Sequence, residues 1–473
     1  MESSKKLEFY GGEWMSFLPF AVFIVLIVQT TFFWGSISDG ALWVPAFMAV
    51  IVSFFLAKDK SHFADVVVQG MASTEAITPV VCWLWAGVFS RLLRVSGLAQ
   101  AIAGYAAGLG VGHVTFTVIT FLASCVFATA TGTGFGTIAM SMGVLYPAGV
   151  ALGCNPALLA GIIISGAAFG DNLAPVSDTT ICSATSQGVD VPGVVRSRFK
   201  YSAVSALITI AITIYLGGKL DASTAAAAGS IAYDPKAFWM LLAVAVTLYV
   251  AMKNGNIIIA CTIGVVVSAV IGILAGQFDF LHVDVANSAK QALFAVHGAG
   301  LDRTVDGIIQ TGLASMLQVC ILALLLFGSI SVMRAGGGDT KLLNALGKVA
   351  TTAVGAEVII SVMVIVLSSI MGLNAPAILA VGASFAKPLS EKYGFSPYRA
   401  ANLLDAQSNT FVYSAPWTPA IIYAISFAKD TSAPLLGIQV TPYVIYGYVL
   451  LVVMFASIFL GIGRHDGMEK AKA

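Results

Sequence analysis

The sequence predicts an all-α polytopic membrane protein with two structural repeats, broken helices and re-entrant hairpins, in about 10 to 12 membrane segments. Three observations lead to this prediction. The composition is 58% hydrophobic and only 10% charged. Apolar runs recur along the chain near the length of about 20 residues that a helical span requires. A set of prolines in the first half returns in the second half at a fixed spacing.

The apolar runs indicate helical spans rather than a soluble core. The clearest runs are 17–34, 41–57, 203–216, 238–252, 257–275, 308–333, 356–373 and 443–462. We interpret the first as a permanent span, because it is longer than the core of a signal peptide. The net charge of +1 argues against a nucleic-acid partner. The six cysteines are scattered through apolar stretches without metal-ligand spacing, which is typical of small buried residues.

The prolines predict an internal duplication. Pro147, Pro156 and Pro175 each have a counterpart in the second half at one common offset (388 − 147, 397 − 156 and 416 − 175, each 241). We therefore expect a first repeat, a polar linker and a second repeat, with a broken-helix region in each repeat. Their bounds are 1–216 with the region 113–190, then 217–236, then 237–473 with the region 354–430.

The basic residues predict the orientation. Lys5 and Lys6 precede the first apolar run, and Arg464, Lys470 and Lys472 follow the last one. Since cytoplasmic segments carry the excess of lysine and arginine, both termini are expected in the cytoplasm. The number of spans is then even. An odd number in each half would make the two repeats inverted.

The segment 170–180 contains the strongest candidate site. A helix that starts at Pro156 should end near Leu173, because of Pro175. Ser177 or Asp178 can then cap a second half-helix. Such a break frees backbone carbonyls beside side-chain oxygens, which are the ligands that hard cations prefer. The candidate ligands are Asp171, Asn172, Ser177, Asp178, Thr179 and Thr180. The alternative is an extramembrane loop in which the acids are simply solvated.

The second repeat offers a matching polar region before Pro416. Asp405 lies one turn before Ser408 and Asn409, so the three share a helix face. The alternative is that Asp405 forms a structural pair with Arg399.

Glycine-rich breaks lie upstream of both regions and contain Thr131, Thr133 and Asn374. They could be hairpin tips or unwound helix centres that bring backbone to an ion, or sites of close helix packing.

The string from Gly170 to Thr180 resembles the signature of the NhaC-type sodium/proton antiporter family, Gly-Asp-X-X-Ser-Pro-X-Ser-Asp-Thr-Thr, with Ala174 in place of one serine. The resemblance implies sodium/proton exchange, with Asp171, Asn172, Ser177, Asp178 and Thr179 as ion-site candidates. It also implies scaffold helices around a transport domain, often in a dimer. Some members of the family resemble exchangers of organic acids or carriers of amino acids.

We therefore expect a secondary transporter in the cytoplasmic membrane that exchanges sodium for protons by alternating access. Sodium would bind at Asp171, Asn172, Asp178 and Thr179. The expected partners are the lipid bilayer, sodium, protons, a small organic solute and a second copy of the chain. No cofactor is expected, and no catalytic constellation supports an enzyme. The alternative function is a sodium- or proton-coupled carrier of an organic acid or amino acid.

Overall fold

The computed structural model describes residues 6–29, 40–175, 177–220, 232–254, 257–283, 291–298, 300–338, 341, 351–429 and 431–466. The helices of the first half are α1 (Leu18–Val28), α2 (Gly40–Leu56), α3 (Lys60–Met71), α4 (Thr74–Val95), α5 (Leu98–Gly108), α6 (His113–Thr131), α7 (Gly134–Ala151), α8 (Pro156–Leu173), α9 (Asp178–Gln187) and α10 (Val191–Lys219). A 3₁₀ turn, η1 (Glu13–Phe17), precedes them.

The second half is also mostly helical. Its α-helices are α11 (Met240–Asn254), α12 (Ile257–Leu274), α13 (Ile308–Ala314), α14 (Leu317–Ala335), α16 (Ala353–Met371), α17 (Asn374–Val381), α18 (Lys387–Tyr393), α19 (Pro397–Ser414), α20 (Pro419–Lys429), α21 (Gly437–Val440) and α22 (Ile445–Phe459). The 3₁₀ turns are η3 (Pro235–Trp239), η4 (Gly300–Asp302) and η6 (Thr441–Tyr443), and a π-turn, η5 (Gly382–Ala386), joins α17 to α18.

In the described part of the chain, four helical segments are long and apolar enough to cross a membrane, or five if the bent pair 437–443 and 445–459 is one span. The four are 134–151, 156–187, 191–219 and 353–371. Five shorter apolar helices accompany them. The 10 to 12 segments expected from the sequence stay a prediction. The expected linker 217–236 lies largely outside the described residues, since α10 continues to Lys219 and η3 begins at Pro235.

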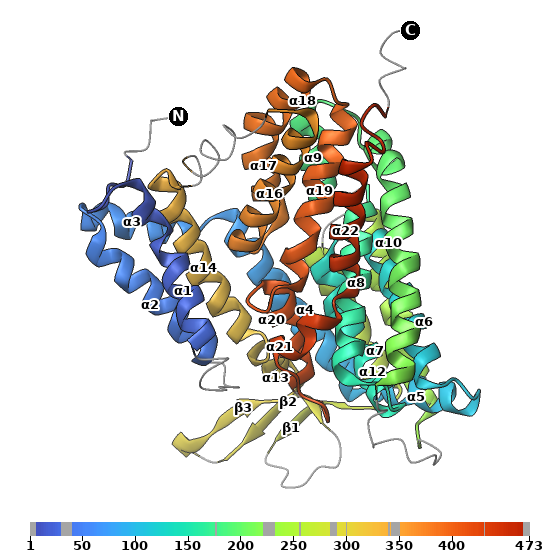
Figure 1. The fold of residues 1–473 in the computed structure, drawn as a ribbon. Helices are drawn as coiled ribbons and strands as arrows, with labels where there is room; N and C mark the ends of the chain where they lie inside the picture. Colours follow the sequence, from blue (N-terminus) through green and yellow to red (C-terminus); the bar gives the residue numbers. More distant parts are fainter. Residues whose placement is uncertain are drawn as a thin grey trace.

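The helices form two groups in Figure 1. Helices α1, α2, α3 and α14 lie at one side, and the larger bundle contains α8, α10, α16, α19 and α22. The largest apolar core extends across both groups, with residues of α7, α8, α16, α19, α20 and α22 packed together with residues of α4 and α14. Both described ends of the chain lie at the same end of the bundle, and a small sheet lies at the opposite end (Figure 1).

The structure is mostly helical, as expected, but it contains one small sheet that the sequence did not predict. Strand β1 (Asp279–Val283) pairs in parallel with β2 (Ala292–His297), which pairs antiparallel with β3 (Thr304–Asp306). The described residues between Leu274 and Ile308 lie outside the helical bundle (Figure 1). Side chains such as Phe280 and Val305 are 58% and 63% exposed. Strand pairing satisfies the backbone groups that this segment no longer bonds within a helix.

Two helical hairpins lie next to the two broken helices. Helices α6 and α7 are joined by a turn at Gly132, and α16 and α17 by a turn at Gly372. Both glycines adopt the left-handed conformation, with φ of 68° and 67°, which side chains disfavour. The spacing of the two turns (372 − 132) is one position shorter than the proline offset. The α6–α7 hairpin starts beside α5 near the sheet, whereas the α16 end of the other hairpin bonds the C-terminal segment through Glu357 and Arg464 (Figure 1).

The broken helices begin and end where local chemistry predicts. Helix α8 starts at Pro156 behind the cap Asn155, whose side chain accepts from the N–H of Leu158, and it ends at Leu173. Helix α19 starts at Pro397 and ends at Ser414, and both of its ends match those of α8 at the proline offset (397 − 156 and 414 − 173). The following half-helices α9 and α20 begin at the same offset (419 − 178). The described part of the second half also breaks the apolar run 308–333, expected as one span, between α13 and α14.

Candidate functional site

The break between α8 and α9 contains a buried carboxylate. Asp171 is 5% exposed. Its Oδ1 accepts a hydrogen bond from the Oγ of Ser177 at 2.9 Å, and its Oδ2 accepts one from the hydroxyl of Tyr413 at 3.0 Å. Tyr413 lies in the last turn of α19, so this bond brings the two helix breaks together across 242 positions of sequence. Both partners of the carboxylate are neutral hydroxyl groups.

Ser177 occupies the N-cap position of α9 but does not cap it. Its backbone is extended, with φ −67° and ψ 138°, as in a cap residue, yet its side chain makes no capping bond. The hydroxyl instead donates to Asp171 and lies 2.9 Å from the Oγ1 of Thr179. The sequence predicted Ser177 or Asp178 as the cap. The Ser177 oxygen therefore points into the break, where it can bind an ion.

A second buried carboxylate, Asp405 on α19, is paired with Arg198 on α10. Both side chains are 0% exposed, and the Nη1 of Arg198 donates to the Oδ2 of Asp405. The same guanidinium donates to the backbone carbonyl of Asn172 at 2.6 Å and to the Oγ1 of Thr180 at 3.3 Å. Arg198 therefore joins the α8–α9 break to the acid of the second half.

Asp405 also contacts the second hairpin tip through asparagines. The Nδ2 of Asn409 donates to the Oδ1 of Asp405 at 2.8 Å, and the Nδ2 of Asn374 donates to the Oδ1 of Asn409 at 2.7 Å. Asn374 is the first residue of α17, directly after the turn at Gly372. Ser408 donates to the backbone carbonyl of Asp405 at 2.8 Å, so its hydroxyl is used within its own helix.

The remaining predicted residues of the break bond other partners than Asp171. Asn172 is buried, and its Nδ2 donates to Ser202 at 2.9 Å and to Tyr446 at 3.1 Å, a different set of partners from that of Asp171. Asp178 is exposed at the start of α9, where its Oδ1 accepts from the N–H of Thr179 at 2.8 Å.

The first hairpin tip contacts the site through the backbone at Gly134, while the side chain of Thr133 caps its own helix. Thr133 caps α7 by accepting from the N–H of Gly136 at 3.3 Å. The side chain of Thr131 lies outside the described residues. The neighbouring Gly134 lies against Tyr413, since a Cβ built there would be 1.9 Å from the tyrosine hydroxyl. The tip therefore closes over the phenol that bonds Asp171.

Within the described residues, no group of three or more histidine, cysteine, aspartate or glutamate side chains could hold a metal ion. An ion here would depend on few carboxylates together with hydroxyl, amide and backbone oxygens. One such oxygen is the Oδ1 of Asn172, which is buried and accepts no hydrogen bond from the described residues.

Sequence reasoning missed three residues that take part in the buried ion pairs or hydrogen bonds of the acids. Arg198 stands shortly before the apolar run 203–216, and its place beside that run was the signal available. Tyr413 had no local signal. Glu357, the third, is 0% exposed and bonds Arg399 at 2.9 Å and Arg464 at 2.8 Å. The suggested Arg399–Asp405 pair is therefore wrong, because the two residues have different partners.

Comparison with known proteins gives consistent matches. A model of the Na+/H+ antiporter family matches residues 12–218 and 201–462. The chain is 25% identical to the Na(+)/H(+) antiporter NhaC of Alkalihalophilus pseudofirmus, over 96% of this chain and 97% of that protein. It is 26% identical to the malate-2H(+)/Na(+)-lactate antiporter of Bacillus subtilis, over 55% of this chain and 57% of that protein, so that match spans just over half of the relative. The YdaH transporter of Alcanivorax borkumensis is similar in structure at a TM-score of 0.42 and 14% identity, over 86% of this chain and 91% of that one.

Proposed function

The chain belongs to the Na+/H+ antiporter family, and we propose that it exchanges sodium for protons at the break between α8 and α9. The family match and the NhaC relative confirm the resemblance seen in the segment 170–180. Together with the apolar helices, they identify an integral membrane protein. The geometry supports a particular carboxylate as the exchanging group.

The observation that carries the proposal is the pairing of the buried acids. Three carboxylates of the described chain are buried: Asp171, Glu357 and Asp405. Glu357 bonds two arginines and Asp405 bonds Arg198, whereas Asp171 bonds only the hydroxyls of Ser177 and Tyr413. A buried carboxylate without a cationic partner is neutralised by a proton or a metal cation. Asp171 is thus the group whose neutralising partner can be exchanged.

Competition for Asp171 couples the two fluxes. A sodium ion would bind the carboxylate with help from the Ser177 and Thr179 oxygens, and the unbonded Oδ1 of Asn172 is a further ligand candidate. A proton would neutralise the same carboxylate when sodium leaves. Because one group accepts either cation, binding of sodium releases a proton. Asp178, which is exposed at this depth, would face water on the way to the site, since lipid disfavours a carboxylate there.

Arg198 gives the second half a different role. It neutralises Asp405 permanently, so Asp405 need not exchange cations. The guanidinium also bonds the carbonyl of Asn172 and the hydroxyl of Thr180, on the two sides of the break. We assign Arg198 and Asp405 to positioning of α8 and α9 relative to α19. Charge movement is then confined to the first break.

We further propose that the two halves are inverted repeats in the cytoplasmic membrane, with both termini in the cytoplasm and with a second copy of the chain as partner. Hairpins that start at opposite ends of the bundle and helix bounds that recur at the proline offset support the inversion (Figure 1). The position of both described chain ends at one end of the bundle supports an even number of crossings. The basic residues near the ends favour the cytoplasm.

A second candidate function is exchange of an organic acid or amino acid coupled to sodium or protons. One structural observation favours it. Gln407 on α19 is 0% exposed, yet neither its Nε2 nor its Oε1 has a partner in the described structure. Such an amide can bond a polar solute. The relative named for malate and lactate supports the same candidate.

The proposal is tested by sodium-dependent proton flux in proteoliposomes. Asp171→Asn retains the size of the side chain and one acceptor oxygen but can neither ionise nor take up a proton, so sodium-dependent exchange should be lost. The matched control is Asp65→Asn, at an exposed position on α3, which should exchange like the unmodified chain. Full exchange by folded Asp171→Asn protein would refute the assignment. A parallel panel of radiolabelled organic acids and amino acids tests the second candidate, which fails if none accumulates under a sodium gradient.

A further inference from the structure

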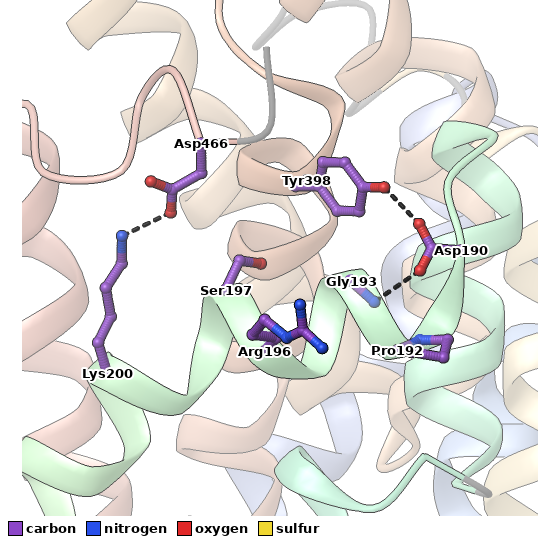
Figure 2. A pocket seen from close by; sticks show the side chains of 8 residues that line it. All are labelled: Asp190, Pro192, Gly193, Arg196, Ser197, Lys200, Tyr398 and Asp466. Atoms are coloured by element: carbon purple, nitrogen blue, oxygen red, sulfur yellow. Dashed lines mark hydrogen bonds and ion pairs between the residues drawn. The ribbon is translucent and has the colours of Figure 1, made fainter. Parts of the chain in front are cut away.

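A polar cavity of about 480 Å³ lies outside the buried site, where α10 begins. It is lined by Asp190, Pro192, Gly193, Arg196, Ser197, Lys200, Tyr398 and Asp466 (Figure 2). This volume is large enough for several water molecules. The Lys200 and Asp466 side chains place the cavity at the end of the bundle where the described C-terminal segment lies.

The rim of the cavity consists of two bonded pairs. Lys200 bonds Asp466, and the hydroxyl of Tyr398 donates to Asp190 (Figure 2). The hydrogen bonds from Tyr398 and from the N–H of Gly193 lower the pKa of Asp190, so it is a carboxylate at neutral pH. In the view of Figure 2, Arg196 and Ser197 lie between the two pairs. The lining therefore carries two cations and two anions, and it does not exclude an ion by net charge.

The wall of the cavity is connected to the buried acid by hydrogen bonds. The Oγ of Ser197 accepts from the Nδ2 of Asn402 at 2.8 Å. The Oδ1 of Asn402 accepts from the Nε of Arg198 at 3.2 Å, and Arg198 is paired with Asp405. Asn402 is 0% exposed, so it bridges the polar cavity and the buried pair.

The bridge belongs to a polar stripe along α19. Tyr398, Asn402, Asp405 and Asn409 are spaced by four, three and four positions, which places them on one helix face. The stripe runs about 16 Å along the helix axis, at about 1.5 Å per residue. Its inner end, Asn409, bonds Asn374 at the second hairpin tip at 2.7 Å. Polar groups therefore connect the cavity to the level of the helix breaks.

We propose that this cavity is the mouth of one of the two access pathways for sodium, and that Asn402 is the positioning residue at its inner end. The inference rests on the proposed sodium/proton exchange and adds to it the route and its side. Hydrated sodium would enter among the charges of the rim and lose water progressively along the α19 stripe. Asn402, whose amide bonds both Ser197 and Arg198, would hold the inner wall of the mouth in place. In the lipid-facing directions, apolar side chains of α10 such as Phe199 and Leu207 are exposed and offer no such route.

The test uses charge reversal at the mouth and measures each side separately. Arg196→Glu changes the local charge by two units at about 10 Å from an entering ion, close to the distance over which salt screens a charge. This should lower the half-saturating sodium concentration about twofold to fourfold on the cavity side only. Proteoliposomes sorted by orientation give the two sides. Lys392→Glu, which reverses an exposed charge on α18 outside the lining, is the matched control and should shift neither side.

A second variant tests access directly. Ser197→Cys, in a chain whose six native cysteines are replaced, should react with an impermeant cationic thiol reagent from the cavity side, and the reaction should block exchange. The inference is overturned if Arg196→Glu shifts the half-saturating sodium concentration on both sides or on neither. It is also overturned if the thiol reagent reacts from the opposite side or from neither side. Failure of the proposed function is a separate result, namely absence of sodium-dependent proton flux in the unmodified chain.

Discussion

The Arg198–Asp405 pair gives a prediction that can be worked from the structure. Both side chains are 0% exposed, and each depends on the other for neutralisation. Asp405→Asn leaves a buried guanidinium without its anion, and Arg198→Gln leaves a buried carboxylate without its cation. Removing one partner of a buried pair lowers the free energy of unfolding by about 3–5 kcal/mol. That is a large share of the roughly 5–15 kcal/mol by which a folded domain is stable.

The double variant should recover part of this loss. Arg198→Gln with Asp405→Asn leaves two neutral amides that can bond each other, so no uncompensated charge stays buried. We expect the loss of unfolding free energy in the double variant to be smaller than the sum of the two single losses by about 2–3 kcal/mol. The assay is chemical unfolding of the purified full chain in detergent for all four proteins. The exposed pair Lys58 and Glu8, 3.0 Å apart, is the matched control and should couple by less than about 1 kcal/mol.

The same four proteins also test the assignment of exchange to the first break. Because Asp171 is left intact, the folded double variant should still exchange sodium for protons. Single losses that add within about 0.5 kcal/mol would show that the two residues do not form an ion pair. Loss of exchange in a folded double variant would refute the view that the pair only positions helices.

Two further predictions concern the groups around Asp171 and Glu357. Tyr413→Phe removes the hydroxyl that donates to Asp171 at 3.0 Å and keeps the ring beside Phe135, at a centroid distance of 6.4 Å. The charged carboxylate then loses a hydrogen bond worth about 1.5 kcal/mol. The half-saturating sodium concentration should therefore rise about tenfold. Unchanged sodium dependence would contradict the geometry. Glu357→Gln removes the anion between Arg399 and Arg464 and should lower the free energy of unfolding by about 3 kcal/mol. The exposed control Glu391→Gln should unfold like the unmodified chain. Equal unfolding of both variants would contradict the buried pairing.

Local chemistry explains which features could be predicted. Pro156 and Asn155 fix the start of α8, and Pro175 fixes its end near Leu173, because a proline lacks the N–H of a helix interior. The recurrence of the prolines at one common offset predicted a broken helix in the second half, where α19 and α20 lie. The sheet at 279–306 was not predicted, because its short strands depend on pairing with each other and not on a strong local pattern.

The sequence by itself determined the broken helices and the polar residues placed within them, since proline, glycine and capping residues act over a few positions. Only the tertiary structure decided which of the acids has a counter-ion. Arg198 and Asp405 are 207 positions apart, and Tyr413 and Asp171 are 242 apart. These partners are set by how α10 and α19 pack against α8, which no local pattern encodes. The packing neutralises Asp405 with Arg198, which no local pattern indicated, and leaves Asp171 to hydroxyl groups alone.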